Sequence, residues 1–104
     1  MQKRHLLLIS AIALQALCGA SVRAGEVEGH AVADRWCAQC HVVSSGQTTA
    51  IAGVPSFADI AKRRTNAEIA GFLADPHPTM KGIGLSTAEI TDVGIYIRSL
   101  ATAP

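Results

Sequence analysis

Apolar residues recur at helical spacing in four stretches of the chain, and no stretch of useful length alternates as a β-strand does. The first stretch ends at Trp36, and the second covers residues 56–63. The third carries Ile69 and the fourth carries Val93, and each follows a Ser/Thr-x-x-Glu sequence, the capping box that begins many helices. The pattern predicts an all-α fold with about four short helices.

The segment before these helices has the order of a secretory signal peptide. The basic residues 3–5 precede the apolar run 6–17, and small residues follow up to Ala24. This run is too short to cross a bilayer, which needs roughly 20 apolar residues. We expect cleavage after Ala24, with cleavage after Ala20 as the alternative. The chain then divides into a removed signal peptide, residues 1–24, and one domain, residues 25–104.

Composition and charge narrow the classes of protein that remain. A chain of 104 residues has the length of one domain. Removal of residues 1–24 takes away three basic residues and no acidic one, so the net charge falls from +1 to −2. A bulk nucleic-acid binder is therefore excluded, because it needs a basic face. Hydrophobic residues make up 49% of the chain but aromatic residues only 4%, which argues against disorder and leaves little bulk for a core.

The chemistry of the chain is concentrated in the sequence Cys37-Ala38-Gln39-Cys40-His41. This is the C-x-x-C-H pattern of covalent haem attachment. Two thiols three residues apart lie on one side of a helical turn, so each can add to one of the two haem vinyl groups. The imidazole of His41 can reach the iron from the same side. We therefore expect one haem c, attached through Cys37 and Cys40, with His41 as an iron ligand.

Two other chemistries use the same cysteines. A thioredoxin-like dithiol would follow a strand in a βαβ unit, whereas a helical pattern precedes this motif. A structural zinc site needs four ligands, and Cys37, Cys40 and His41 supply three, two of them adjacent in sequence. Haem attachment is therefore the favoured interpretation.

A second iron ligand is expected from the loop of residues 75–85. This loop holds two prolines and two glycines, so it cannot be regular structure and needs an anchor. Met80 is the one methionine that remains after the leader is removed. A thioether ligand would favour reduced iron and raise the redox potential. The alternatives are Met80 as a core residue and ligation by His77, which would lower the potential.

Four landmarks resemble, in their order, those of the small class I c-type cytochromes over about residues 27–101. The landmarks are the first helix running into Cys37, the segment Gly53-Val54-Pro55-Ser56-Phe57, the methionine loop, and a last helix with Tyr96-Ile97-x-x-Leu100. One departure is Lys81 after the methionine, where the family frequently has a proline.

The resemblance implies the cytochrome c fold, with crossed N- and C-terminal helices and the short helices wrapped around one covalent haem. It implies that Met80 ligates the iron opposite His41. It also implies that the carbonyl of Pro55 accepts a hydrogen bond from the His41 ring, which would orient the ligand.

Within this fold, Tyr96 is expected to pack across the first helix near Gly29, where the missing side chain allows close approach. Gly94 is expected to serve the same crossing, and His30 is expected at the surface. The basic run 62–64 is interpreted as a solvated helix end, with pairing to a haem propionate or docking of an acidic partner as alternatives. Other apolar residues are expected in the core or the haem pocket: Trp36, Phe57, Ile60, Phe72 and Leu73.

These features predict a periplasmic monohaem electron-transfer protein that is not an enzyme and cycles between Fe(II) and Fe(III). Its partners would be redox proteins, a donor dehydrogenase or membrane complex and an acceptor oxidase or other cytochrome. We expect a monomer that does not span the membrane. The alternatives are a tightly bound haem subunit of one exported dehydrogenase, or a haem sensor or weak peroxidase with an open iron site.

Overall fold

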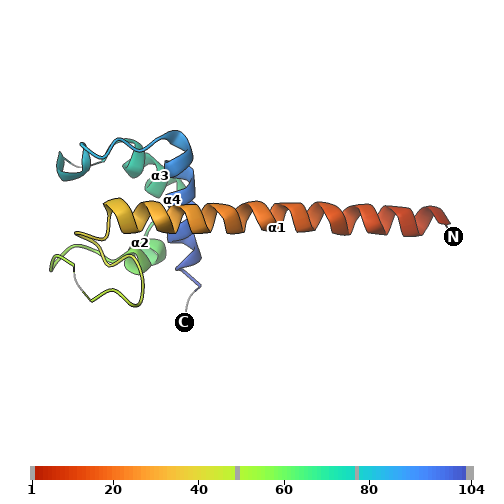
Figure 1. The fold of residues 1–104 in the computed structure, drawn as a ribbon, viewed down its shortest axis with the longest axis horizontal. Coiled ribbons are helices and arrows are strands. Elements are labelled where there is room, and N and C mark those ends of the chain that lie inside the picture. Colours follow the sequence, from red (N-terminus) through yellow and green to blue (C-terminus); the bar gives the residue numbers. More distant parts are fainter. Residues whose placement is uncertain (1, 49, 77, 103–104) are drawn as a thin grey trace.

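The computed structural model describes residues 2–48, 50–76 and 78–102, with side chains described from residue 19 onward. Within these residues the chain is helical and has no strand, which confirms the predicted all-α fold (Figure 1). The elements in chain order are α1 (Gln2–Trp36), α2 (Phe57–Arg63), α3 (Asn66–Ala74), the 3₁₀ helix η1 (Pro78–Met80) and α4 (Thr87–Ser99).

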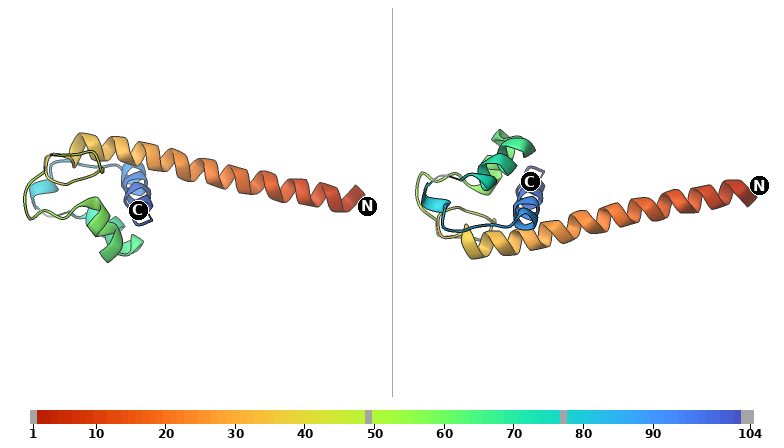
Figure 2. Two further views of the ribbon diagram at one scale, coloured as in Figure 1. Left: turned by 90° about the horizontal axis from the view of Figure 1, so that it is seen from below. Right: turned by 90° about the horizontal axis from the view of Figure 1, so that it is seen from above.

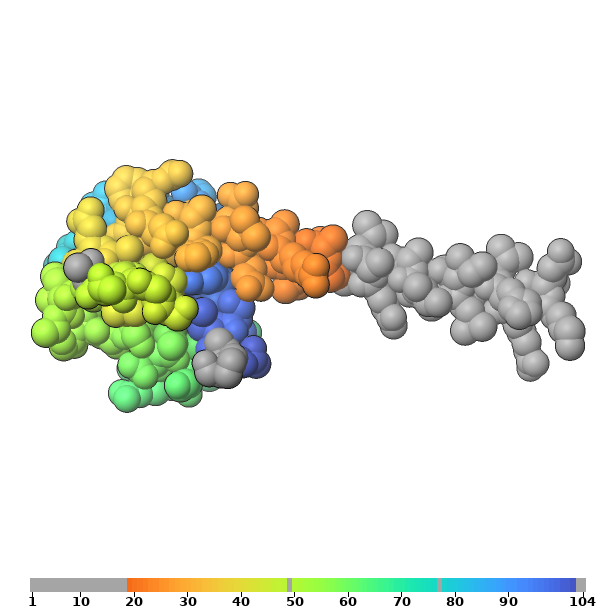
Figure 3. All heavy atoms as spheres, turned by 60° about the horizontal axis from the view of Figure 1, so that its bottom comes forward, coloured from red at the N-terminus to blue at the C-terminus, as the bar shows by residue number. Residues whose placement is uncertain are grey.

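The first helix is much longer than predicted. α1 is one continuous helix of 35 residues, and its orange segment projects from the rounded body of the molecule (Figure 3). The apolar run 6–17 consists mainly of Leu, Ala and Ile, and no proline separates it from Trp36, so nothing in the sequence breaks the helix. In the part of the chain that the structure describes, no helix is both long enough and apolar enough to span a bilayer.

Hydroxyl side chains fix the beginning of each later α-helix. Thr65 and Ser86 form the two predicted capping boxes with Glu68 and Glu89, and the Thr65 N–H donates to the Glu68 carboxylate at 2.7 Å. Ser56, which sequence reasoning did not single out, caps α2 by accepting a hydrogen bond from the Asp59 N–H. The capping boxes are confirmed, and they set where α3 and α4 start.

The crossing of α1 and α4 is the main contact between helices (Figure 1). A Cβ atom at Gly29 would overlap the carbonyl oxygen of Asp92 and would lie 2.8 Å from the Tyr96 Cβ atom. The predicted approach of Tyr96 to Gly29 is therefore confirmed. The expectation for Gly94 is wrong, because a Cβ atom there would meet nothing within 4 Å. The close contact is made by the backbone of Asp92 instead.

The buried core gathers around this crossing. Val93 is fully buried on α4, and Val43, from the loop after the cysteine motif, is 1% exposed. The hydroxyl of Tyr96 donates to the Val43 carbonyl at 2.5 Å, so α4 holds that loop across 53 residues of sequence. The other core residues come from the four α-helices and from the cysteine motif: Val32, Ala33, Cys37, Phe57, Ala61, Ile69, Leu73, Tyr96 and Ile97.

His30 is only partly at the surface. Its ring stacks on Tyr96, with ring centroids 4.5 Å apart and planes 10° from parallel. Its Nε2 atom lies 3.5 Å from the Asp34 carboxylate, and 43% of the side chain is exposed. The expectation of a surface histidine is therefore only partly right, because the Tyr96 ring of α4 covers one face of the His30 ring.

Arg98 near the end of α4 holds the junction between α2 and α3. Its guanidinium donates to the carbonyl oxygens of Ala61 and Arg64 at 2.8 and 2.6 Å, and to the Asn66 side chain at 2.7 Å. The last carbonyls of a helix have no partner within the helix, so this side chain satisfies groups at the end of α2. Sequence reasoning missed this role, since nothing local to Arg98 indicates it.

We predict opposite effects on stability for two glycine substitutions, one at Gly29, where α1 and α4 touch, and one at Gly94, away from this contact. Gly29→Ala should lower the free energy of unfolding by about 1–3 kcal/mol, because the added methyl group overlaps α4. Gly94→Ala, the matched control, should raise it by about 0.5–1 kcal/mol, because alanine favours the helix and meets open space. Denaturant titration of the haem-containing protein measures both, and equal effects would contradict the crossing at Gly29.

Replacement of Arg98 should destabilise the fold more than loss of a surface charge. Arg98→Met keeps most of the side-chain length but removes the donors to three acceptors, so we expect a loss of about 2–3 kcal/mol in the free energy of unfolding. Lys62→Met, at an exposed position of α2, is the control and should change the free energy of unfolding by less than about 0.5 kcal/mol. A loss in Arg98→Met no larger than in the control would show that the clamp contributes nothing.

Candidate haem site

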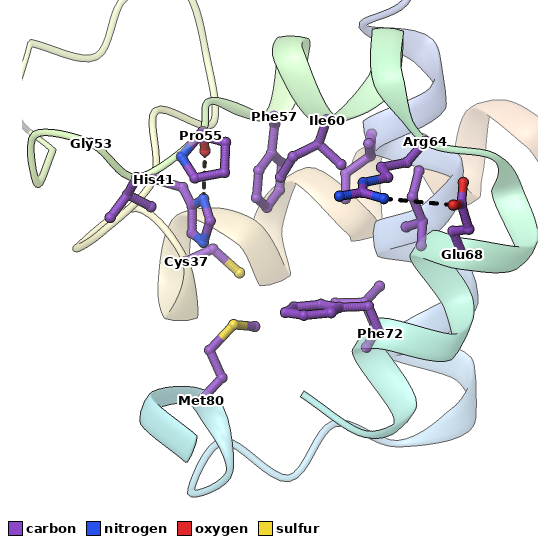
Figure 4. Close-up of a pocket in the computed structure, with 14 residues that line it drawn as sticks. Cys37, His41, Gly53, Pro55, Phe57, Ile60, Arg64, Glu68, Phe72 and Met80 are labelled. Atoms are coloured by element: carbon purple, nitrogen blue, oxygen red, sulfur yellow. Dashed lines mark hydrogen bonds and ion pairs between the residues drawn. The ribbon is translucent and has the colours of Figure 1, made fainter. Parts of the chain in front are cut away.

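An apolar cavity of about 460 Å³ lies between the end of α1, the pair α2 and α3, and η1 (Figure 4). Figure 2 shows these elements standing around a common centre in both views. The volume is within the range of cofactor and ligand pockets. The lining residues are Cys37, His41, Gly53, Val54, Pro55, Phe57, Ile60, Arg64, Glu68, Ile69, Phe72, Leu73, Met80 and Ile97.

The cysteine motif forms a tight turn directly after α1. The N–H groups of Cys40 and His41 both donate to the Cys37 carbonyl, at 3.0 and 2.9 Å. Cys37 is 4% exposed and lines the cavity, while Cys40 is half-buried and is not among the lining residues. Both thiols are unpaired by any disulfide. The structure thus places one sulfur at the cavity and the other in the same turn.

The ring of His41 is oriented by the loop that precedes α2. Its Nδ1 atom lies 2.7 Å from the carbonyl oxygen of Pro55 (Figure 4). A carbonyl can only accept, so Nδ1 carries the proton and Nε2 of the neutral ring keeps its lone pair. In Figure 4 this second nitrogen is turned away from Pro55, into the cavity. Such an imidazole is prepared to bind a metal ion, since its tautomer and its direction are both set.

Met80 reaches the cavity from the opposite wall. It is the last residue of η1, the single helical turn within a loop that the sequence indicated to be irregular. Its sulfur points across the cavity toward Cys37 and His41 (Figure 4). The Ile83 N–H donates a hydrogen bond of 3.1 Å to the Met80 carbonyl, which fixes the turn after Met80. The competing ligand considered from sequence, His77, lies outside the described residues.

The electrostatics of the cysteines disfavour a reactive dithiol. Burial, together with a smaller effect of the nearby Cys40, raises the pKa of the Cys37 thiol to about 11. Redox-active cysteines instead have lowered pKa values, because the thiolate is the nucleophile. Among the residues with described side chains, no three His, Cys, Asp or Glu side chains are grouped to hold a metal ion, which also disfavours the zinc interpretation.

Most of the apolar residues predicted for the pocket do line it. Phe57, Ile60, Phe72 and Leu73 are at the wall, and Phe72 is at the rim with 49% of its surface exposed. Trp36 is the exception, because it is 45% exposed and does not line the cavity. α4 crosses α1 about two turns before Trp36, so it does not cover that ring.

One charged pair borders this apolar site. Arg64, at the end of the basic run, lies 3.6 Å from Glu68, and both line the cavity (Figure 4). The other two residues of the run, Lys62 and Arg63, are exposed in the last turn of α2, where cations are favoured. The interpretation of the run as a solvated helix end holds for these two, and Arg64 belongs to the site.

Sequence reasoning missed one residue that organises the turn. The carboxamide of Gln47 makes hydrogen bonds to the backbone of residues 38, 41 and 43. The sequence carries no signal for it, because a glutamine in a Ser/Thr/Gly-rich loop is ordinarily a solvated residue. Only the fold of the loop back onto the turn reveals the contact.

The helical fold and the C-x-x-C-H turn at an apolar cavity are those of a small c-type cytochrome. The chain is 43% identical to cytochrome c-552 from Bradyrhizobium diazoefficiens over 99 residues, which cover 93% of each chain. It therefore belongs to the c-type cytochromes, as the order of its landmarks indicated. No family model matches the chain, and no solved structure matches it.

A c-type cytochrome carries a covalently bound haem, and the residues at the cavity fit this group. The donor set offers two thiols three residues apart, an imidazole with its lone pair turned inward, and a thioether facing it. The walls are mainly apolar, as a porphyrin requires, and the one charged pair is at the edge. The residues around this cavity are therefore suited to hold a haem.

Proposed function

We propose that this protein is an exported monohaem electron carrier, with haem attached through Cys37 and Cys40 and with His41 and Met80 as axial ligands. The observation that carries the proposal is the pair of opposed donors at one apolar cavity, the imidazole held by Pro55 and the Met80 sulfur. When bound, the haem supplies an iron that changes between Fe(II) and Fe(III).

Each residue of the site has a defined task in this function. The hydrogen bond from His41 Nδ1 to Pro55 fixes the ring and makes its other nitrogen a better ligand. A methionine on the other side favours reduced iron and raises the potential. The apolar wall, including Phe57 and Ile60, would shield a bound haem from water. If His41 and Met80 both bind the iron, they would leave no open position for oxygen or peroxide, which favours a carrier over an enzyme.

Electrons would pass to and from redox proteins during brief encounters. Electron-transfer complexes bury small interfaces and release quickly, which suits a carrier that must leave each partner. The donor would be an exported dehydrogenase or membrane complex, and the acceptor an oxidase or another cytochrome.

Export is the remaining part of the proposal. The order of basic, apolar and small residues supports a signal peptide over residues 1–24 and a periplasmic location. Gly25 and Gly29, at which α1 meets α4, both follow Ala24. Cleavage after Ala24 would therefore leave these crossing contacts with the mature domain.

The covalent attachment predicts that haem stays with the chain when the chain is unfolded. The exported wild-type protein should stain for haem on a denaturing gel, and its intact mass should equal residues 25–104 plus one haem. The double variant Cys37→Ser/Cys40→Ser should lose the stain, because no thioether can form. A stained double variant, or an unstained wild type, would contradict the proposed attachment.

The ligand assignment predicts a lower potential when the thioether is replaced. Met80→His and Met80→Ala should both lower the redox potential by a fraction of the about 0.8 V that axial ligands span. Met80→Ala should also bind carbon monoxide readily in the reduced state, because the sixth position opens. Thr79→Ala in the same loop is the control and should leave both measurements unchanged. A wild type that itself binds carbon monoxide readily at neutral pH would mean that Met80 is not a ligand.

A further inference from the structure

Gln47 bridges three backbone groups that belong to the cysteine motif and the residues after it. Its Nε2 atom donates to the carbonyl oxygens of Ala38 and His41, at 2.9 and 2.6 Å. Its Oε1 atom accepts from the Val43 N–H at 2.9 Å. The two N–H groups of the carboxamide thus face two carbonyls, and its oxygen faces an N–H. This arrangement permits only one orientation of the amide group.

The acceptors of Gln47, the carbonyls of Ala38 and His41, lie in the turn beyond the last residue of α1. Backbone carbonyls outside a helix have no helical partner and need another donor when they are shielded from water. No side chain within the turn Cys37–His41 makes an observed hydrogen bond to the carbonyl of Ala38 or of His41. Gln47 supplies both bonds from outside the turn, and it is half-buried while it does so.

The same contact connects the turn to the core. Val43, whose N–H donates to Gln47, has its carbonyl bound by the Tyr96 hydroxyl, and its side chain is 1% exposed. The backbone of Val43 is therefore held on one side by Gln47 and on the other by α4. Movement of the turn relative to the core would break these buried and partly buried hydrogen bonds, and a buried polar group without a partner is costly.

We propose that Gln47 is a positioning residue for the His41 ligand, a role that rests on the proposed function of His41 at the iron. Two residues of one loop share the task. Pro55 fixes the ring of His41 through Nδ1, and Gln47 fixes its backbone through the carbonyl. With only the first contact, the ring would be oriented but the backbone that carries it could shift. The pair holds both ends of the ligand.

Two substitutions remove this contact in different ways. Gln47→Glu is isosteric, but it replaces the donor nitrogen by a charged oxygen that faces two carbonyl oxygens. Gln47→Ala removes all three hydrogen bonds without adding charge. The second variant keeps the test decisive where the first fails to fold.

The experiment follows the Nδ1–H proton of His41 in the oxidised, haem-containing protein. Iron shifts the proton resonances of a ligating imidazole away from the others, so the exchange of this proton with deuterium can be followed by NMR. In both Gln47 variants we expect exchange about tenfold faster than in the wild type, which corresponds to the loss of one net hydrogen bond from the local opening free energy.

Two controls separate positioning from general effects. Ser45→Glu adds the same charge at an exposed position of the same loop and should leave the exchange rate unchanged. Thr65→Ala removes the cap of α3 and destabilises the fold away from His41. If Gln47 were merely structural, Thr65→Ala would accelerate exchange as much as Gln47→Ala at equal loss of stability, and the inference would be wrong.

The wild type distinguishes this inference from the proposed function. If the wild type shows no iron-shifted imidazole resonances, His41 is not the ligand, and both proposals fail together. If the wild type shows them and the Gln47 variants exchange at the wild-type rate, only the positioning role of Gln47 fails.

Discussion

The contact between the backbone of α4 and Gly29 of α1 is the constraint on which the rest of the structure depends. A side chain at residue 29 would overlap the Asp92 carbonyl, so the two helices meet this closely only because that side chain is absent. The close approach brings Tyr96 against α1, where its ring stacks on His30. It also buries Val93 completely. A small domain with few aromatic residues gains much of its apolar burial in this way.

Two polar side chains of α4 connect the helix crossing to the haem-site segments. The Tyr96 hydroxyl holds the loop after the cysteine motif through Val43. The Arg98 guanidinium holds the junction of α2 and α3, beside the Arg64 and Glu68 pair at the cavity edge. The segments that form both walls of the cavity are thus hydrogen-bonded to the same helix, α4. This matters for a redox site, because its ligands must keep their geometry in both oxidation states.

The loops perform most of the work at the site itself. His41 is the last residue of a turn, Pro55 and Gln47 lie in an irregular loop, and Met80 ends a single 3₁₀ turn. None of these residues is held by a long helix of its own. Their positions come from hydrogen bonds between loops, and a covalently attached haem would add its own connections between the same segments. A chain poor in aromatic bulk can fold in this manner because the cofactor supplies a large apolar body.

The sequence by itself determined the features that depend on near neighbours. Capping boxes, helical periodicity and the C-x-x-C-H spacing act within a few residues, so Thr65, Ser86 and the turn after Trp36 could be placed without a structure. The order of landmarks was enough to indicate the family. Apart from the approach of Tyr96 to Gly29, which was expected, only the tertiary structure decided which residues meet across long stretches of chain. It selected Gly29 and not Gly94 for the crossing, left Trp36 exposed, and gave Arg98 and Gln47 their partners. The physical reason is that a polar side chain can bond to many groups. Its actual partner is fixed only when the fold brings an unsatisfied carbonyl within hydrogen-bonding distance.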